Sequence, residues 1–469
     1  MKKLISCFLF ILFIATTKGQ DAAARLEAAY KIFENDPQLK SALASLYVID
    51  AKSGKTVFDR NSRIGLAPAS TQKIITSAAA YEMLGKDFRY QTVLGYYGDL
   101  ENGNLAGSIV IRGSGDPTLG SWRWKQTREE AVMQRMVQSV KAASIRSFQN
   151  LVSHETGWES ETIPGGWVWD DIGNYYGAGA GIVNWRENQY DLLLKSGADT
   201  GSVVSISGTV PALYDFNIVS RLVAAPKGTG DNAYIYFPQS STMQVVRGTI
   251  PVSENRFVIS GAMPSARHQF MRTLADSLSR SGISGSTSYA VVDRFNINQP
   301  AREWKVIHTE TSPPLDSISY WFLRRSINLY GEALAKTMAE RSSKLASTDN
   351  GSGVIRDLWA KKNIGIDRSE LNLHDGSGLS PHNRTTTHAQ VRVLQYAHKQ
   401  DWFNGYFHGF PEYNGMKMKS GTISGVKGFC GYHVSKTGTT YIFSFLVNNY
   451  NGSASALVQK MYRVLDVLK

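Results

Sequence analysis

The sequence predicts an α+β fold in which the two ends of the chain build one domain and the middle forms a strand-rich insertion. Three observations lead to this prediction. Helix and strand patterns mix up to about Gln91, short strand-like runs with Gly-rich turns continue to about Pro300, and helical patterns resume from Leu315. The 469 residues, 42% hydrophobic and 19% charged, suffice for two to three structural units and argue against long disordered segments.

The first part of the chain is predicted to contain a helix, a hairpin and a second helix. Ala22–Phe33 has apolar residues at helical spacing. Leu46–Asp50 is a strand-like run, and Thr56–Asp59 follows it across a short turn as a hairpin partner. Ser70–Leu84 is rich in Ala, Ile and Thr and stops at Gly85, which predicts a buried helix with a glycine at its C-terminal end.

The remaining elements follow the same patterns. The strand-like runs of the middle are Ser108–Arg112, Ser202–Val210 and Tyr234–Phe237. The later helical patterns are Leu315–Arg341, Gly353–Lys362, Thr387–Lys399 and Ser455–Leu468, and the closing strands are Met416–Ser420 and Thr440–Asn448. We therefore predict a domain formed by residues 20–91 and 300–469, with an inserted region of one or two subdomains at 92–299.

The first residues indicate export. Two lysines follow Met1, the 12 residues Leu4–Ala15 are apolar apart from Ser6, and small and polar residues continue to Gln20. This arrangement is typical of a secretory signal peptide, here residues 1–19, because such a run is too short to span a bilayer. Leu4–Cys7 resembles a lipoprotein cleavage box, but no apolar run precedes Cys7, so lipid anchoring is not expected. No later apolar stretch approaches 18 residues, and we expect no integral membrane anchor.

Cysteine and charge usage exclude several classes of protein. Signal cleavage would remove Cys7 and leave Cys430 alone, so no intrachain disulfide is expected and the fold must depend on its core. Cleavage would also remove three lysines and lower the formal net charge from +12 to +9. This mild charge suits an acidic polymer such as cell wall, and export argues against a nucleic-acid partner.

Common hydrolase and metal motifs are missing from the sequence. There is no Gly-x-Ser-x-Gly elbow, and His154-Glu155 is not followed by a histidine at the spacing of a zinc helix. The nine histidines form no ligand cluster, so no metal site and no cofactor are expected.

The segment Ser70-Thr71-Gln72-Lys73 at a helix start provides the first candidate catalytic pair. Residues three apart share a helix face, so Lys73 can reach the Ser70 hydroxyl. As a base, Lys73 must be neutral, which requires lowering its pKa from about 10.4 towards 7, or about 4 kcal/mol. A helix end contributes only about 0.3–1 kcal/mol, so burial and a second nearby cation must supply the rest. The chemistry predicts another lysine close to Lys73.

Short patterns that accompany such a pair are common in this chain. Ser-x-x-Lys recurs at Ser424–Lys427, Ser-x-Asn occurs at Ser253–Asn255 and Ser326–Asn328, and Lys-(Ser/Thr)-Gly begins at Lys52, Lys195, Lys419 and Lys436. Taken singly, each is more often a turn or a surface patch. Their order along the chain and their flanking residues are more informative.

Longer segments resemble the penicillin-binding serine D-alanyl-D-alanine carboxypeptidases, and most closely the insertion-bearing group that includes penicillin-binding protein 4 (peptidase family S13). The matching segments, in order, are Pro68–Lys73, Gly113–Leu119, Ser312–Leu315, Ser326–Glu332, Asp375–Ser380 and Lys419–Thr422, followed by Gly425-Val426 and Gly431-Tyr432. The resemblance covers about Tyr47 to Asn449. It implies a β-lactamase/transpeptidase-like antiparallel sheet flanked by helices, with the strand-rich region inserted.

The resemblance also implies roles for the motif residues. Ser70 would be the nucleophile, Lys73 the base for acylation and Ser326 a proton relay to the leaving amine. Asn328, Lys419, Ser420, Gly421 and Thr422 would bind substrate, with the backbone N–H groups of Ser70 and Thr422 as the oxyanion hole. The implied partners are peptidoglycan stem peptides, with β-lactam antibiotics as covalent inhibitors, and the implied location is the periplasm.

Lys419, and not Lys436, is predicted to be the lysine of the third motif. Met416–Ser420 is strand-like, and alternation would direct Lys419 to one face of the sheet. Lys436 lies between two β-rich runs, which predicts an exposed hairpin turn. Lys419 is therefore the predicted second cation.

Several features depart from the family pattern or leave alternatives open. Ile327 replaces a common aspartate, Ser420 replaces threonine, and Gly177–Gly181 and His154-Glu155 differ from the expected insertion. Asp375–Ser380 is equally explained as a glycine turn or as a lining of the site. The alternative functions are a β-lactamase or esterase on the same fold and a catalytically silent wall-binding protein. The complete serine and lysine set argues against the silent protein.

Overall fold

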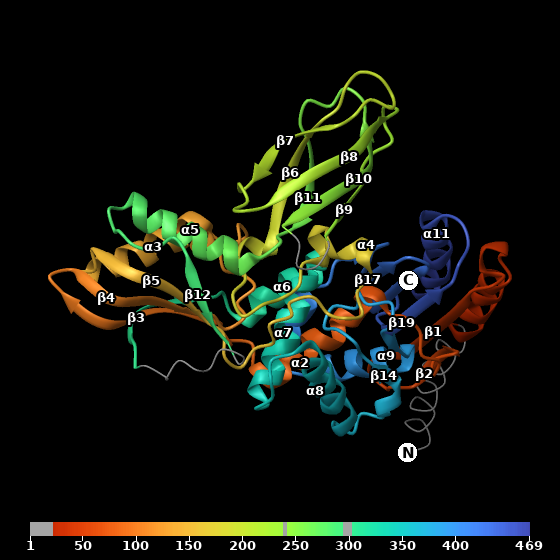
Figure 1. Cartoon of the computed structure of the whole chain (residues 1–469). Coiled ribbons are helices and arrows are strands. Elements are labelled where there is room, and N and C mark those ends of the chain that lie inside the picture. Colours follow the sequence, from red (N-terminus) through yellow and green to blue (C-terminus); the bar gives the residue numbers. More distant parts are fainter. Residues whose placement is uncertain (1–21, 238–241, 294–302) are drawn as a thin grey trace, which may run out of the picture. The chain divides into compact units, whose positions relative to one another are not determined.

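The computed structural model describes residues 22–237, 242–293 and 303–469. Two compact units can be distinguished, and each is assembled from separate parts of the sequence (Figure 1). The first unit contains the described residues up to Met83 together with Ser319–Ser326 and Ser352–Lys469, and the second contains Leu84–Ile318 and Ile327–Gly351. The predicted signal peptide, residues 1–19, lies outside the described residues. Among the described residues, no helix has both the length and the apolar character needed to cross a membrane.

The first unit is built on a six-stranded antiparallel sheet in the order β16-β17-β18-β19-β1-β2. These strands are β1 (Leu43–Asp50), β2 (Thr56–Arg60), β16 (Glu412–Tyr413), β17 (Met416–Ile423), β18 (Val426–Val434) and β19 (Thr440–Asn448). The pairing of β1 with β19 joins the two ends of the sequence. Seven consecutive residues of β19 are buried, as expected of a strand that is covered on both faces.

Helices cover both faces of this sheet. On one face, the helix over residues 22–34 and α11 (Ala454–Leu465) share an apolar core with strand residues such as Phe443 and Phe445. On the other face, α9 (Thr387–Ala397) contacts β1, β18 and β19, and the 3₁₀ turn η2 (Ala69–Gln72) contacts β17 and β18. The remaining helical elements of this unit are η1 (Pro37–Leu39), α2 (Lys73–Leu84), α8 (Thr348–Lys361, whose first turn belongs to the second unit), η6 (Arg368–Glu370), α10 (Phe403–His408) and η7 (Asp466–Leu468). A two-stranded ribbon joins β14 (Leu371–Asn372) and β15 (Arg384–Thr385).

The second unit contains a five-stranded sheet in the order β12-β5-β4-β3-β13 and two three-stranded sheets, β8-β10-β9 and β11-β6-β7. Its strands are β3 (Gln91–Glu101), β4 (Asn104–Arg112), β5 (Ser147–His154), β6 (Gln189–Lys195), β7 (Ser205–Val210), β8 (Asn217–Ala225), β9 (Asn232–Tyr236), β10 (Met243–Pro251), β11 (Phe257–Ala262), β12 (Tyr289–Val292) and β13 (Lys305–Thr311). Its helical elements are η3 (Lys125–Thr127), α3 (Glu129–Ala142), α4 (Trp169–Ile172), η4 (Tyr175–Gly177), η5 (Arg186–Asn188), α5 (Ala266–Arg280) and α7 (Asn328–Arg341). The two three-stranded sheets enclose one apolar core, and α3 and α5 pack with the larger sheet around another.

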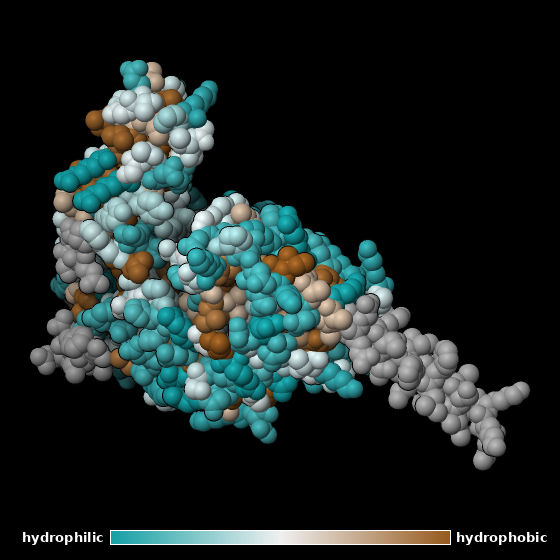
Figure 2. Space-filling model, turned by 90° about the vertical axis from the view of Figure 1, so that its right-hand side faces the viewer, coloured by the Kyte–Doolittle hydropathy of each residue, from teal (hydrophilic) through white to brown (hydrophobic). Residues whose placement is uncertain are grey.

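The predicted fold class is confirmed: helices flank an antiparallel sheet, and the middle of the sequence is rich in strands. None of the six strands of the first unit's sheet comes from residues 92–299. The domain limits 20–91, 92–299 and 300–469 stay predictions. On the face that Figure 2 shows, most residues are hydrophilic and the hydrophobic residues form a few small groups.

Two predicted helices differ from the structure. The pattern over Leu315–Arg341 is interrupted, because α6 (Leu315–Arg325) ends and α7 begins at Asn328. Ser326 lies between them with φ of +59°, a left-handed conformation that an α-helix cannot contain. The helix predicted from Ser70 begins as η2, and α2 starts only at Lys73.

Candidate active site

Ser70 and Lys73 face each other at the junction of η2 and α2. The distance from Lys73 Nζ to Ser70 Oγ is 2.9 Å. In a 3₁₀ turn, residues three apart are eclipsed, so the turn aligns these two side chains more closely than an α-helix would. Lys73 is fully buried, whereas Ser70 is partly exposed. The pair therefore places a hydroxyl within reach of solvent and an amine behind it.

The backbone before Ser70 is strained. Ala69 has φ of +47° and is fully buried. A non-glycine residue in this region costs about 1–3 kcal/mol and persists only where the surroundings determine it. The residue preceding the candidate nucleophile is thus held in an unfavourable conformation by its packing.

The loop Asp375–Ser380 lines the candidate site. Lys73 Nζ donates to the Ser377 carbonyl at 2.7 Å, and Thr76 Oγ1 donates to the Gly376 carbonyl at 2.7 Å. Gly378 has φ of +85°, and a Cβ there would lie 2.0 Å from the Ala69 carbonyl. The sequence left a role for this loop open. The structure places it against Lys73 through a backbone carbonyl, a contact that leaves no side-chain signature in the sequence.

Asp375 holds that loop in shape. Its carboxylate accepts hydrogen bonds from the Gly378 N–H at 2.7 Å, the Ser380 N–H at 2.6 Å and Asn383 Nδ2 at 2.9 Å. Gln72 Nε2 donates to the Asp375 carbonyl at 2.6 Å, which ties the loop to η2. The sequence motif implied no chemistry for Asp375, and in the structure its carboxylate supports the loop through these hydrogen bonds.

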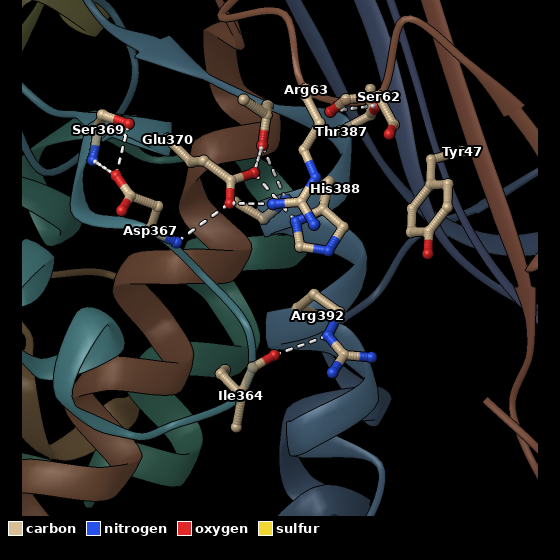
Figure 3. Close-up of polar contacts among 12 residues, drawn as sticks. Tyr47, Ser62, Arg63, Ile364, Asp367, Ser369, Glu370, Thr387, His388 and Arg392 are labelled. Carbon is tan, nitrogen blue, oxygen red and sulfur yellow. Dashed lines mark hydrogen bonds and ion pairs between the residues drawn. The ribbon is translucent and has the colours of Figure 1, made fainter. Parts of the chain in front are cut away.

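A second buried carboxylate, Glu370, lies at the centre of a group of polar contacts (Figure 3). Glu370 accepts hydrogen bonds from Arg63 at 2.7 Å and Thr386 at 2.6 Å, and its Oε2 lies 3.0 Å from His388 Nδ1. Burial raises the pKa of Glu370, but the contacts with His388, Thr386 and the Asp367 N–H outweigh it and lower the pKa to about 2. In the sequence, Glu370 precedes the Asp375–Ser380 loop, and its partners Thr386 and His388 follow that loop. Its third partner, Arg63, lies in the segment before Ser70, so one carboxylate joins all three segments.

Lys419 and Ser326 form the second pair of the first unit. Lys419 Nζ donates to Ser326 Oγ at 2.9 Å and to the Ser420 carbonyl at 2.8 Å. Only 1% of Lys419 is exposed, and burial, with a smaller effect of Lys427, lowers its pKa to about 7. The left-handed backbone of Ser326 turns the chain at this point. This position is consistent with the prediction that Lys419 is the lysine of the third motif.

β17 passes close to the backbone of η2 at Gly421. A Cβ at this position would lie 2.6 Å from the Pro68 carbonyl, 2.8 Å from the Thr71 nitrogen and 3.0 Å from the Ser70 nitrogen. Only glycine allows this approach without displacing backbone. The neighbouring Ser420 hydroxyl donates to Tyr413 at 3.4 Å, and the exposed Thr422 hydroxyl accepts from Lys427 at 2.7 Å.

Lys436 lies in the exposed turn between β18 and β19, as the sequence predicted. Its backbone N–H donates to the Lys469 carbonyl. This position in a surface turn agrees with the choice of Lys419 for the third motif.

Asn328 opens α7 in the second unit. Its side chain is buried, and Nδ2 donates to the Tyr176 carbonyl at 2.7 Å. Within the first unit the structure thus brings Ser70 together with Lys73 and Ser326 together with Lys419, while Asn328 is fixed by contacts of its own unit.

Comparison with known protein families identifies the family of this chain. The model of the D-Ala-D-Ala carboxypeptidase 3 (S13) family matches residues 26–466. The chain belongs to this family. The predicted enzyme class, a serine-type D-Ala-D-Ala carboxypeptidase hydrolase, is thereby confirmed.

Two curated relatives of this chain are D-alanyl-D-alanine carboxypeptidases, and the alignment covers most of each relative. The chain is 25% identical to the D-alanyl-D-alanine carboxypeptidase of Actinomadura sp. (strain R39) over 458 residues, which cover 90% of this chain and 81% of that protein. It is 24% identical to the D-alanyl-D-alanine carboxypeptidase DacB of Haemophilus influenzae over 414 residues, covering 86% and 82%.

The S13 fold is also found among solved structures. Penicillin-binding protein 4 (dacB) from Haemophilus influenzae aligns with a TM-score of 0.78 at 20% identity, covering 92% of this chain and 97% of that one. The same protein in complex with a novel β-lactam aligns with a TM-score of 0.73, covering 91% and 96%. The predicted resemblance to the group that includes penicillin-binding protein 4 is confirmed.

Proposed function

We propose that this chain hydrolyses the terminal D-Ala-D-Ala bond of peptidoglycan stem peptides through an acyl-enzyme on Ser70, and that penicillins acylate the same serine. The observation that carries this proposal is the 2.9 Å distance between Ser70 Oγ and Lys73 Nζ, with Gly421 of β17 beside the Ser70 backbone. Serine becomes a nucleophile only with a base in hydrogen-bond reach, and this lysine is in that position.

In the acylation step, neutral Lys73 takes the proton of Ser70, and Oγ attacks the carbonyl carbon of the penultimate D-Ala. The negative charge that develops on the carbonyl oxygen is stabilised by the backbone N–H groups of Ser70 and Thr422. The C–N bond then breaks, and the proton that Lys73 took from Ser70 is relayed through the Ser326 hydroxyl to the leaving amine, which departs as D-Ala. A water molecule hydrolyses the ester and restores the Ser70 hydroxyl.

The other motif residues bind the substrate in this proposal. Lys419, buried and with a lowered pKa, binds the terminal carboxylate, and the Ser420 hydroxyl assists it. A carboxylate next to this amine favours its charged form, because an opposite charge within about 4–6 Å raises the pKa of a lysine. Asn328 binds the amide of the stem peptide through its side chain.

A fluorescent penicillin tests the assignment of the nucleophile. We expect covalent labelling of the wild-type protein and no labelling of Ser70→Ala, because the acyl-enzyme requires the hydroxyl. Labelled peptides identified by mass spectrometry should contain Ser70. Undiminished labelling of Ser70→Ala would contradict the proposal.

The substrate is tested with a defined pentapeptide stem and a crosslinked dimer, whose products are identified by mass. Release of D-Ala from the stem supports the carboxypeptidase, and cleavage of the dimer would add an endopeptidase activity. Rapid turnover of nitrocefin would favour the alternative, a β-lactamase on the same fold. We also propose export to the periplasm with removal of residues 1–19, which N-terminal sequencing of the secreted protein would test.

A further inference from the structure

The loop Gly177–Gly181, called the glycine loop below, lies along helix α7 in the second unit (Figure 1). At one end, Asn328 Nδ2 donates to the Tyr176 carbonyl at 2.7 Å, and at the other end Lys336 Nζ donates to the Ala180 carbonyl at 3.0 Å. Eight residues of helix rise about 12 Å, and four residues of chain reach at most about 14 Å. The loop therefore follows the helix for about two turns.

The glycine loop has little room to move sideways. A Cβ on Gly177 would lie 2.0 Å from the Asp171 carbonyl, and one on Gly179 would lie 2.2 Å from the Thr162 carbonyl. Asn188 Nδ2 donates to the Gly179 carbonyl at 2.8 Å. Since neighbouring backbone fixes the loop on its other sides, a change at one anchor can be transmitted along it.

Lys336 holds the glycine loop through a buried amine. It is fully buried, and Nζ also donates to the Glu161 carbonyl at 2.8 Å and lies 3.6 Å from Glu159 Oε2. Burial lowers the pKa of Lys336, while the Glu159 carboxylate opposes this effect. An ammonium has three donors, and here they join α7 to two segments of the strand-rich region.

A second contact ties α7 to the chain that follows the glycine loop. Tyr330 donates to Glu187 Oε1 at 2.8 Å, and Glu187 also accepts two hydrogen bonds from Arg123. Arg186, Glu187 and Asn188 all have φ between +53° and +55°, so three consecutive non-glycine residues are left-handed. Such a turn is unfavourable and requires the support of its surroundings.

We propose that Lys336 is a positioning residue for Asn328 and acts through the glycine loop. By holding Ala180, Lys336 fixes the path of the loop and with it the Tyr176 carbonyl. A carbonyl can only accept a hydrogen bond, so it turns the NH₂ side of the Asn328 amide towards itself and determines the direction of the amide oxygen. This inference rests on the proposed function, in which the Asn328 amide binds substrate.

Selective ¹⁵N-asparagine labelling tests the positioning directly. Lys336→Met keeps the aliphatic part of the side chain and removes the donors. The Asn328 side-chain amide resonance, assigned by its loss in Asn328→Ala, should shift in Lys336→Met and stay in place in Lys195→Met, a matched change of an exposed lysine in the same unit. An unchanged Asn328 resonance in Lys336→Met would overturn the inference.

A double-mutant cycle tests the consequence for catalysis. Lys336→Met should lower kcat/KM for D-Ala release about tenfold in the wild-type background and have no further effect in the Asn328→Ala background. Equal effects in both backgrounds would show a merely structural role and contradict the inference. If the wild-type protein neither released D-Ala nor reacted with penicillin, the proposed function would fail, while the amide resonance would still decide the positioning role of Lys336.

Discussion

Lys419 is a buried lysine whose surroundings favour the binding of an anion. Among the described residues, its ammonium is within hydrogen-bond distance of a hydroxyl and a carbonyl, Ser326 and Ser420, and makes no ion pair. Burial lowers its pKa to about 7, well below the ordinary value for lysine. Burial thus disfavours the charged form, and a bound carboxylate would favour it.

This residue leads to a prediction for the pH dependence. Because the free enzyme must carry the charged Lys419 to bind a carboxylate, kcat/KM for D-Ala release should decrease as the pH rises through about 7. In Lys419→Arg, whose guanidinium stays protonated, the decrease should move to higher pH. The measurement is kcat/KM between pH 5 and 10 with a stem pentapeptide, and identical profiles for both proteins would contradict the assignment.

A pair of alanine substitutions provides the control for this prediction. Lys419→Ala should lose nearly all D-Ala release, whereas Lys436→Ala in the exposed turn should lose little. The reverse outcome would show that the literal Lys-Thr-Gly match is the functional third motif.

At the scale of elements, the junction of η2 and α2 with β17 determines the geometry of the site. The 3₁₀ turn aligns Ser70 with Lys73, and Gly421 lets the strand approach the backbone of the turn. Both features depend on backbone positions that a single methyl group would disturb.

Gly421→Ala should therefore reduce acylation strongly without preventing folding. The added Cβ would lie 2.6 Å from the Pro68 carbonyl, so strand or turn must shift. We expect the second-order rate constant for a fluorescent penicillin to fall about 100-fold, or about 2.7 kcal/mol. Gly353→Ala in α8, where a Cβ meets nothing within 4 Å, is the matched control and should react as the wild type does. A wild-type rate in Gly421→Ala would show that the close approach is not required.

The contacts of Glu370 with Arg63, Thr386 and His388 lead to a prediction for the free energy of unfolding. Glu370→Gln should lower the free energy of unfolding by about 2 kcal/mol at neutral pH, because Arg63 and His388 lose their carboxylate. In the wild-type protein, this stabilisation is present above the ordinary glutamate pKa of 4.5 and is lost as the pH falls towards about 2.

Urea unfolding at several pH values measures this effect, with Glu412→Gln at an exposed position as the control. The difference between wild type and Glu370→Gln should shrink between pH 4.5 and 2. A constant difference over this range would show that the charge of Glu370 does not contribute to stability.

For the whole molecule, the sequence predicted the features that side-chain type and spacing encode. The three-residue spacing of Ser70 and Lys73 predicted their contact. Strand alternation predicted that Lys419 points to one face of the sheet, and the hairpin pattern predicted an exposed Lys436. It did not predict the contact of Lys73 with the Ser377 carbonyl, because every residue has a carbonyl and only the folded loop directs this one. The left-handed Ser326 was missed for a similar reason, since the apolar pattern of a helix continues across it.

The arrangement of the first sheet also has a consequence for the order of folding. β1 pairs with β19, for example Val48 with Phe443, although about 400 residues separate them in the sequence. Contacts of such high sequence separation form slowly, because the loop between the two strands must be closed first. During synthesis, β1 emerges long before its partner strand exists, so the sheet behind Ser70 cannot be completed until almost the whole chain has been made. In a nascent chain, the edge of β1 that pairs with β19 therefore stays without its partner until Thr440–Asn448 has been made, and an unpaired strand edge of this kind favours aggregation.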